Sequence, residues 1–254
     1  MTLTHKNRMT VAAHRGDSYN YFENTMTAFK MALENGADMI ETDVRLSKDG
    51  YAVLIHDDTV NRTTNGNGKV CDLTLNQLRE LNAGNALAPE KIPTFEEFIA
   101  WASKTELTLN IELKEYYNEE NRERCVKCIE DVIALVEKYG MAERVVLNSF
   151  DAWILEYVYK KYGKKYLLHG FYPYSIMGNV SISPDEYLYC ACIFDDGNKA
   201  LYDYLIEKGV EPWIGASVTQ GQRLKLCYQY GAKLVTTNNP RDAKRKLGLI
   251  KEEE

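Results

Sequence analysis

Two acidic residues stand two positions apart in a segment that otherwise has the composition of a buried strand. The segment 39–58, MIETDVRLSKDGYAVLIHDD, carries Glu41, Asp43 and His56 among apolar and β-branched residues. Successive strand side chains point to opposite faces, so Glu41 and Asp43 share a face. Like charges placed side by side weaken a strand. A bound cation would offset this repulsion, so the spacing predicts a metal site.

A second segment, NIELK, repeats the pattern and places Asn110, Glu112 and Lys114 on one strand face. Glu41, Asp43 and Glu112 then supply carboxylates from two strands. Ligands that are all oxygen atoms favour a hard divalent ion over zinc. The sequence therefore predicts one divalent cation, Mg²⁺ or Ca²⁺, and leaves the choice between them open.

Histidines and fixed positive charges accompany these carboxylates. His14 and Arg15 end the candidate strand of AHRG, where Gly16 would let the backbone turn. His14 and His56 are suited to act as acid and base near neutral pH, while Arg15 and Lys114 are suited to hold an anion such as phosphate. Each residue alone also fits an ordinary ion pair or a solvated strand face. Together they indicate phosphodiester hydrolysis assisted by a metal ion.

The dipeptide Asp49-Gly50 favours a tight hairpin turn. With these two residues at the turn, Asp43 lies opposite His56 on the same face as Glu41. A longer loop would shift this register and send His56 to the other face.

Short β-rich runs alternate with amphipathic runs along the chain. This alternation with eight strand candidates predicts a (β/α)8 barrel, and a doubly wound open sheet is the alternative. The length of 254 residues suits a single barrel domain over 1–254. The residues 57–93 interrupt the alternation and are predicted to be a small inserted cap after the hairpin. The strand candidates are 10–15, 39–46, 107–113, 144–150, 166–171, 187–194, 210–216 and 233–238, and the helix candidates are 24–34, 119–138, 151–162, 200–208, 222–230 and 240–247.

Composition narrows the classes of partner. The formal charge is −6 and no basic stripe is present, which argues against nucleic acid. Apolar runs fall short of the roughly 18 residues of a membrane span, and the first residues lack the apolar core of a signal peptide. We therefore expect a cytoplasmic protein with no membrane insertion. Cys125 and Cys128 have CxxC spacing without further zinc ligands, which favours reduced thiols. The oligomeric state is not indicated.

The motifs also resemble a known family, the glycerophosphodiester phosphodiesterases, which are TIM barrels. The resemblance runs nearly end to end, and HRG, ExD, KDG followed by HD, and IELK are specific in combination. Some positions depart from the usual pattern: Phe22 replaces a proline, and Asn238 replaces an aspartate. These departures concern substrate preference more than activity. The motifs stand in the family order as AHRG, ENTMTAF, GADMIETDVRLSKDG, VLIHDDTVNRTTNG, IPTFEEF, NIELK, VVLNSFD and TTNNP.

The resemblance implies roles for particular residues. Asn24 would lie near the site, and Phe150 and Trp213 would form an aromatic wall around glycerol, with ordinary core packing as the alternative for both. The remaining roles follow the reasoning above: metal binding by Glu41, Asp43 and Glu112, acid/base work by His14 and His56, and phosphate binding by Arg15 and Lys114.

The expected reaction is hydrolysis of a glycerophosphodiester to sn-glycerol 3-phosphate and an alcohol. A lysophospholipase D or phospholipase C-like phosphodiesterase is an alternative, and a non-catalytic barrel that binds phosphorylated metabolites ranks lower. Four points stay open: the alcohol, the pathway, which histidine is the acid, and whether water attacks directly or a cyclic phosphate forms first.

Overall fold

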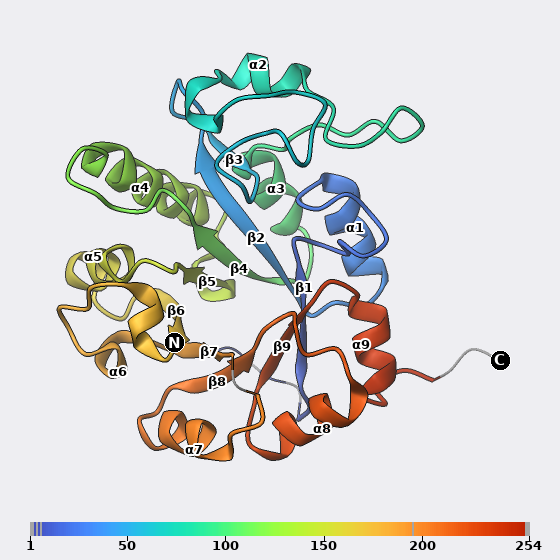
Figure 1. The fold of residues 1–254 in the computed structure, drawn as a ribbon, viewed down its shortest axis with the longest axis vertical. Coiled ribbons are helices and arrows are strands. Elements are labelled where there is room, and N and C mark those ends of the chain that lie inside the picture. The colour runs from blue at the N-terminus through green and yellow to red at the C-terminus, as the bar shows by residue number, and fades with distance from the viewer. Residues whose placement is uncertain (1–2, 4, 6, 195, 252–254) are drawn as a thin grey trace.

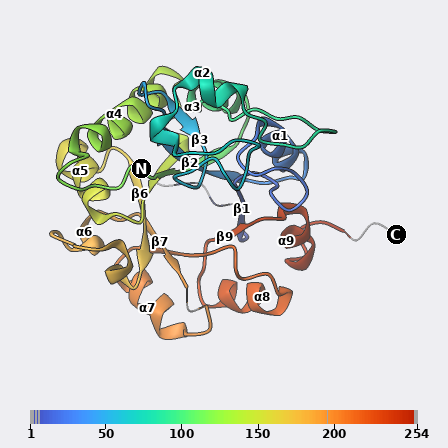
Figure 2. The same cartoon turned by 45° about the horizontal axis from the view of Figure 1, so that its top comes forward.

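The computed structural model describes residues 3, 5, 7–194 and 196–251. Eight parallel strands close into a barrel because β1 pairs with both β2 and β9 (Figures 1 and 2). The predicted (β/α)8 barrel is therefore confirmed, and the open sheet is excluded. In barrel order the strands are β1 Thr10–His14, β2 Met39–Leu46, β4 Thr108–Leu113, β5 Val145–Asn148, β6 Leu167–Tyr172, β7 Cys190–Ile193, β8 Glu211–Ile214 and β9 Leu234–Thr237.

Helices surround the barrel and bury their apolar faces against the outside of the strands (Figure 2). The barrel interior is also packed, because a layer of buried side chains from seven strands fills its lower part. Buried polar side chains, among them Glu41, Asp43 and Glu112, lie above this layer, towards the carboxyl ends of the strands. The helices are α1 Met26–Glu34, α2 Leu75–Glu80, α3 Phe95–Ala102, α4 Arg122–Lys138, α5 Ala152–Tyr162, α6 Pro184–Tyr187, α7 Lys199–Glu207, α8 Gly221–Gln229 and α9 Pro240–Lys246.

The hairpin after β2 has a different register from the one predicted. Strand β3, Ala52–Leu54, pairs antiparallel with β2, and Val44 faces Leu54. Gly50 has φ of +83°, which suits a turn one residue longer than the predicted two-residue turn. Asp43 therefore accepts a backbone hydrogen bond from Ile55 (3.2 Å) and does not face His56. The predicted pair is wrong by one residue, and His56 lies beyond the end of β3.

The residues 57–93 form a compact segment beside this hairpin, with α2 lying outside β3 in Figure 1. The carboxylate of Asp49 accepts the backbone N–H of Leu75 (2.8 Å), which fastens the start of α2 to the turn. A separate cluster of buried apolar side chains joins the segment to β3. It consists of Val53, Ile55, Val60, Val70, Leu78, Ala83 and Ile92.

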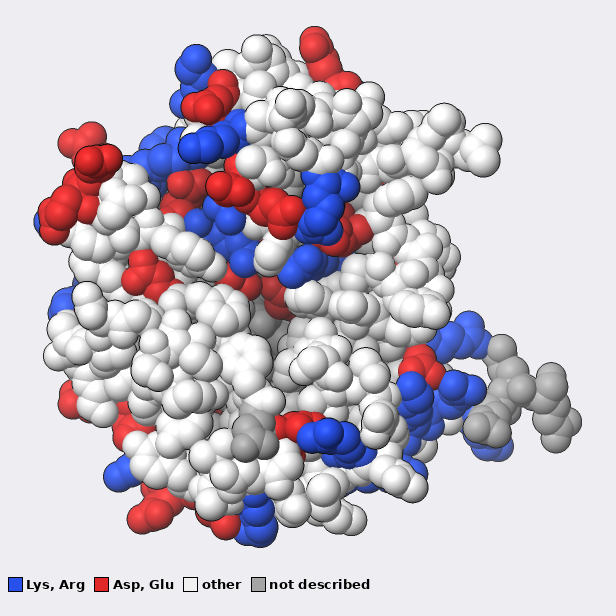
Figure 3. Space-filling model, viewed as in Figure 1, with Lys and Arg blue, Asp and Glu red and all other residues white. Residues whose placement is uncertain are grey.

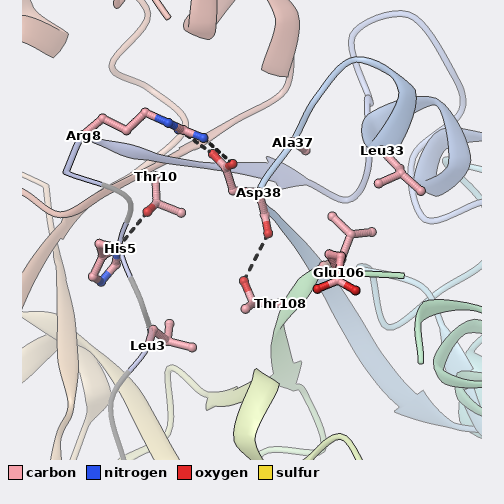
Figure 4. Close-up of a pocket in the computed structure, with 10 residues that line it drawn as sticks. Leu3, His5, Arg8, Thr10, Leu33, Ala37, Asp38, Glu106 and Thr108 are labelled. Atoms are coloured by element: carbon pink, nitrogen blue, oxygen red, sulfur yellow. Dashed lines mark hydrogen bonds and ion pairs between the residues drawn. The ribbon is translucent and has the colours of Figure 1, made fainter. Parts of the chain in front are cut away.

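Paired polar groups close the opposite end of the barrel. Arg8 forms a bidentate ion pair with Asp38, with nitrogen–oxygen distances of 2.6 and 2.8 Å. His5 contacts Thr10 (2.7 Å) and Glu211 (2.9 Å). A cavity of about 160 Å³ lies among these residues (Figure 4). Because the polar groups bind one another at the amino ends of the strands, this end contributes to stability. Among the described residues, no helix has the length and apolar character needed to cross a membrane.

The chain turns sharply where β1 ends. Arg15 and Gly16 have φ of 57° and 82°, in the left-handed region. A side chain at Gly16 would place its Cβ 2.7 Å from the carbonyl carbon of Ala28 in α1. The turn needs glycine there for two reasons, backbone conformation and close packing.

We expect Gly16→Ala to lower the free energy of unfolding by about 2–4 kcal/mol, since a left-handed alanine costs about 1–2 kcal/mol and the clash adds to it. Gly140→Ala is the matched control, because Gly140 has φ of 64° but open space around its Cβ position. Urea unfolding of both variants separates strain from clash. If both variants lose the same free energy of unfolding, Ala28 moves away from the new Cβ at no energetic cost.

Candidate active site

Three buried carboxylates lie together at the carboxyl ends of β2 and β4. Glu41, Asp43 and Glu112 are 3%, 0% and 6% exposed, and each offers an oxygen within 4.8 Å of the others. Asp43 and Glu112 are register neighbours on adjacent strands. Burial, with the charges of Asp43 and Glu112, raises the pKa of Glu41 well above its usual value. Burial and the charge of Asp43 also raise the pKa of Glu112.

Two cations partly balance this negative charge. Nζ of Lys114 lies 2.6 Å from Glu112 and 3.3 Å from Oδ1 of Asp43. Nε of Arg15 lies 3.3 Å from Oδ2 of Asp43. Burial raises the pKa of Asp43, but Lys114 and Arg15 outweigh burial and bring the pKa below its usual value. Asp43 is therefore the carboxylate that stays ionised most readily.

Asn24 joins the first loop to β2 through both ends of its amide. Its Nδ2 donates to Oδ2 of Asp43 (2.9 Å), and its Oδ1 accepts from the hydroxyl of Thr42 (2.7 Å). Asn24 has φ of 55°, a conformation that asparagine adopts more readily than most residues. The structure thus places Asn24 against a candidate metal ligand, as the resemblance implied.

His14 reaches the same site from the end of β1. Its Nε2 lies 3.9 Å from Oε2 of Glu41, and its Nδ1 lies 2.6 Å from Oδ1 of Asn238. Because a carbonyl oxygen can only accept, Nδ1 carries the proton and Nε2 is the nitrogen that faces the carboxylates. Burial, with the charge of Arg15, lowers the pKa of His14, which favours a neutral ring.

Asp57, the first residue of the inserted segment, contacts the ring of His56. Nδ1 of the ring lies 2.7 Å from Oδ1 of Asp57, whose other partner is Arg62 (2.7 Å). Arg62 also binds Glu23 (2.8 Å), and Glu23 binds Arg15 (3.0 Å). Burial lowers the pKa of His56 more than the nearby charge of Asp43 raises it.

The sequence reasoning missed several of these residues. Asp57, Arg62 and Glu23 form a chain of ion pairs between loops far apart in sequence, and single-strand periodicity carries no sign of it. Tyr116 was also missed, and its hydroxyl donates to Oε1 of Glu112 (3.2 Å). Burial, with the charge of Glu112, raises the pKa of Tyr116 to about 12, so the hydroxyl keeps its proton. Only its position two residues after Lys114 could have drawn attention to it.

The two aromatic residues implied by the resemblance lie in different surroundings. Phe150 is half-buried at the end of β5 and stacks on Phe171, with ring centroids 3.5 Å apart. Trp213 is fully buried in the packed lower layer of the barrel, and its indole N–H donates to Glu211 (3.3 Å). The position of Trp213 favours core packing, which was the alternative for it.

The assembled site combines a cluster of oxygen ligands with cations and two histidines. Figure 3 shows acidic and basic side chains interleaved on one side of a central hollow, with uncharged side chains on the other side. Oδ1 of Asp43 is buried and makes an ion pair with Nζ of Lys114 at 3.3 Å but no hydrogen bond. Three adjacent carboxylates, each with an oxygen within 4.8 Å of the others, fit a hard divalent cation.

Comparisons with known proteins agree with this arrangement. A model of the glycerophosphoryl diester phosphodiesterase family matches residues 14–177. A glycerophosphodiester phosphodiesterase of Caldanaerobacter subterraneus subsp. tengcongensis is 44% identical over 158 residues, which cover 59% of this chain and 61% of that protein. Human glycerophosphodiester phosphodiesterase 1 is 42% identical over 118 residues, which cover 44% of this chain and 36% of the human protein. The matched regions thus span less than two thirds of either relative.

Solved structures share the fold. A putative glycerophosphoryl diester phosphodiesterase from Silicibacter pomeroyi superposes with a TM-score of 0.80 at 19% identity, covering 97% of this chain and 94% of the other. A phosphodiesterase from Oleispira antarctica, solved with the product sn-glycerol-3-phosphate, superposes with a TM-score of 0.78 at 24% identity. The superposition covers 95% of this chain and 98% of the Oleispira chain. With the family model matching well over half of its residues, the chain belongs to the glycerophosphoryl diester phosphodiesterase family.

Proposed function

We propose that the protein hydrolyses glycerophosphodiesters to sn-glycerol 3-phosphate and an alcohol, with the help of one divalent cation, Mg²⁺ or Ca²⁺. The observation that carries the proposal is the buried trio of Glu41, Asp43 and Glu112, whose oxygens lie within 4.8 Å of one another beside two histidines and two cations. The names of the relatives support the substrate class, as does the product found in the Oleispira structure.

Glu41, Asp43 and Glu112 would hold the cation. When bound, the cation supplies Lewis-acid stabilisation of the negative charge that grows on phosphoryl oxygens. The site fits this role because three buried carboxylates that repel one another offer oxygens within 4.8 Å, while Oδ1 of Asp43 makes an ion pair with Lys114 but no hydrogen bond. Asn24 would keep Asp43 in place from the side away from that oxygen.

The chain's own residues supply the rest of the chemistry. Arg15 and Lys114 would bind phosphate oxygens through charge-assisted hydrogen bonds. His14 and His56 each use Nδ1 in a hydrogen bond, which leaves Nε2 to exchange protons. One histidine would take the proton of the attacking hydroxyl, and the other would donate a proton to the departing alcohol oxygen. Both lowered pKa values keep a neutral ring available as the base near pH 7. Phe150 would contact the glycerol side of the substrate.

The metal proposal predicts that Glu41→Gln stabilises the protein in EDTA by about 1–3 kcal/mol, because removing one like charge relieves repulsion while the amide oxygen still accepts from the N–H of Arg15. Because the pKa of Glu41 is raised in the folded protein, ionisation of this carboxyl group at higher pH destabilises the folded state. The gain should thus be small near pH 4 and larger near pH 8. Thermal unfolding with and without EDTA is the measurement.

The same experiment has two controls. The exposed variant Glu120→Gln should leave stability unchanged. Added Mg²⁺ or Ca²⁺ should stabilise the wild type and have less effect on Glu41→Gln, because ligand binding favours the folded state. A wild type that neither ion stabilises would argue against the metal site.

Turnover of glycerophosphocholine tests the reaction. We expect EDTA to abolish it and a divalent ion to restore it. His14→Ala and His56→Ala should each lower kcat by at least about 100-fold, the usual contribution of general acid/base catalysis. His5→Ala, at the other end of the barrel, is the control and should retain activity. Full rates in EDTA would refute the metal role. Faster hydrolysis of lysophosphatidylcholine than of glycerophosphocholine would favour the lysophospholipase alternative.

The ion-pair chain that holds His56 predicts a role for Arg62. Arg62→Met frees Asp57 and Glu23 together, so His56 loses its fixed orientation, and we expect kcat to fall roughly 10–100-fold, as for other outer-shell partners. Arg79→Met is the matched control, since Arg79 lies in the same inserted segment and pairs with Glu97 (2.7 Å) away from the site. Equal effects of both variants would mean that Arg62 only stabilises the segment.

A further inference from the structure

We propose that Arg45 is a positioning residue, which ties the backbone of His56 to the end of β4 and so fixes the separation between His56 and Lys114. This inference rests on the proposed hydrolysis and adds a residue to it. Nothing in the family match or in the names of the relatives assigns a role to Arg45.

The backbone of His56 lies beyond the strand that leads to it. Strand β3 ends at Leu54, and the backbone N–H of Ile55 still donates to the carbonyl oxygen of Asp43 (3.2 Å). The contact with Asp57 orients the ring of His56. Because Asp57 is the next residue along the chain, this contact alone does not tie the backbone of His56 to the barrel strands. That tie must come from another group.

Arg45 provides the tie from β2. It stands two residues after Asp43, so strand alternation places its side chain on the face that carries Glu41 and Asp43. Its Nε donates to the carbonyl oxygen of His56 (2.9 Å), and its Nη1 donates to the carbonyl oxygen of Lys114 (3.2 Å). Lys114 directly follows the last residue of β4. One guanidinium group therefore joins the chain beyond β3 to the chain beyond β4.

The geometry of this contact suits arginine in particular. A guanidinium group is planar and presents its donors in a rigid fork, so two acceptors that bind it are held in a fixed relation to each other. A lysine ammonium group is a point charge on a flexible stem and imposes no such relation. Arg45 is half-buried, so water competes only in part for the two carbonyl oxygens.

The two residues that Arg45 joins have different tasks in the proposed reaction. Lys114 would bind the phosphate, and its Nζ is itself fixed by Glu112 (2.6 Å) and Asp43 (3.3 Å). His56 would exchange a proton with an oxygen atom attached to that phosphate. The distance between the two residues therefore decides whether the imidazole reaches this oxygen. A displacement of about 1 Å is enough to cost on the order of 100-fold in rate.

The first test measures kcat and KM for glycerophosphocholine in the metal-loaded protein. We expect Arg45→Met to lower kcat roughly 10–100-fold, as for other outer-shell partners, and to change KM by less than about threefold. Arg45→Lys should lower kcat by a similar factor, because it keeps the charge and loses the fork. Recovery of the wild-type kcat in Arg45→Lys would show that Arg45 acts by charge alone and would overturn the positioning role.

Arg144→Met is the matched control for loss of stability. Arg144 also donates to backbone carbonyl oxygens, those of Ser103 (3.1 Å) and Leu107 (3.2 Å), but at the opposite end of β4. Both variants should unfold at lower urea concentration than the wild type, and Arg144→Met should keep kcat within about twofold of the wild type. Equal losses of kcat in the two variants would assign the effect of Arg45 to stability and overturn the inference.

A double-mutant cycle tests whether Arg45 acts through His56. In the His56→Ala background there is no imidazole to position, so Arg45→Met should lower kcat by less than about threefold. A loss as large as in the wild-type background would overturn the link between Arg45 and His56.

The NMR signals of the His56 imidazole separate this inference from the proposed function. The chain has four histidines, and the spectrum of His56→Ala identifies the signals of this one. They should shift or broaden in Arg45→Met and stay unchanged in Arg144→Met. That result supports the positioning role even if no diester is hydrolysed, in which case only the proposed function fails. Unchanged signals in Arg45→Met overturn this inference and leave the proposed function standing.

Discussion

Repulsion among three buried carboxylates is the constraint on which the rest of this site depends. Glu41 and Asp43 share one strand face, and the parallel register places Glu112 beside Asp43. The fold tolerates the cluster because Lys114 and Arg15 lie within 3.3 Å of Asp43. Two cations beside three carboxylates still leave a net negative charge in a region with little access to water, where unpaired charge is costly. The same imbalance would give the site the affinity for a divalent cation that we propose.

The cations connect this centre to the inserted segment. Arg15 contacts Asp43 on one side and Glu23 on the other, and Glu23 is shared with Arg62. Arg62 then orders Asp57, which orients His56. His56, which the inserted segment holds through Asp57, is therefore linked to Asp43 in the barrel through one continuous set of ion pairs. Several charges fixed by bidentate contacts form a stronger link than isolated surface pairs do.

Strand periodicity predicted what depends on single strands, and long-range contacts account for what it missed. The alternation of faces was sufficient to group Glu41 with Asp43 and Glu112 with Lys114, and the eight strand candidates gave the barrel. The hairpin register was wrong because Gly50 permits a three-residue turn as readily as a two-residue one. His56 lies beyond the end of β3, and its contact with Asp57 rather than strand pairing fixes its ring. The side chains of Arg62 and Tyr116 meet their partners only after the loops fold, and a buried Trp213 has the same local sequence signal as an exposed one.

Asn238 contacts His14, and the choice of asparagine over aspartate at this position affects the pKa of that histidine. The resemblance led us to note it as a departure, because an aspartate is more usual there. In this structure it accepts the Nδ1 proton of His14 at 2.6 Å, which fixes the tautomer as a carboxylate would. Burial, with the charge of Arg15, keeps the pKa of His14 below its usual value, although the hydrogen bond to Asn238 acts in the opposite direction. An aspartate would raise that pKa and favour the charged imidazolium. The asparagine therefore orients His14 so that its Nε2 faces the carboxylates.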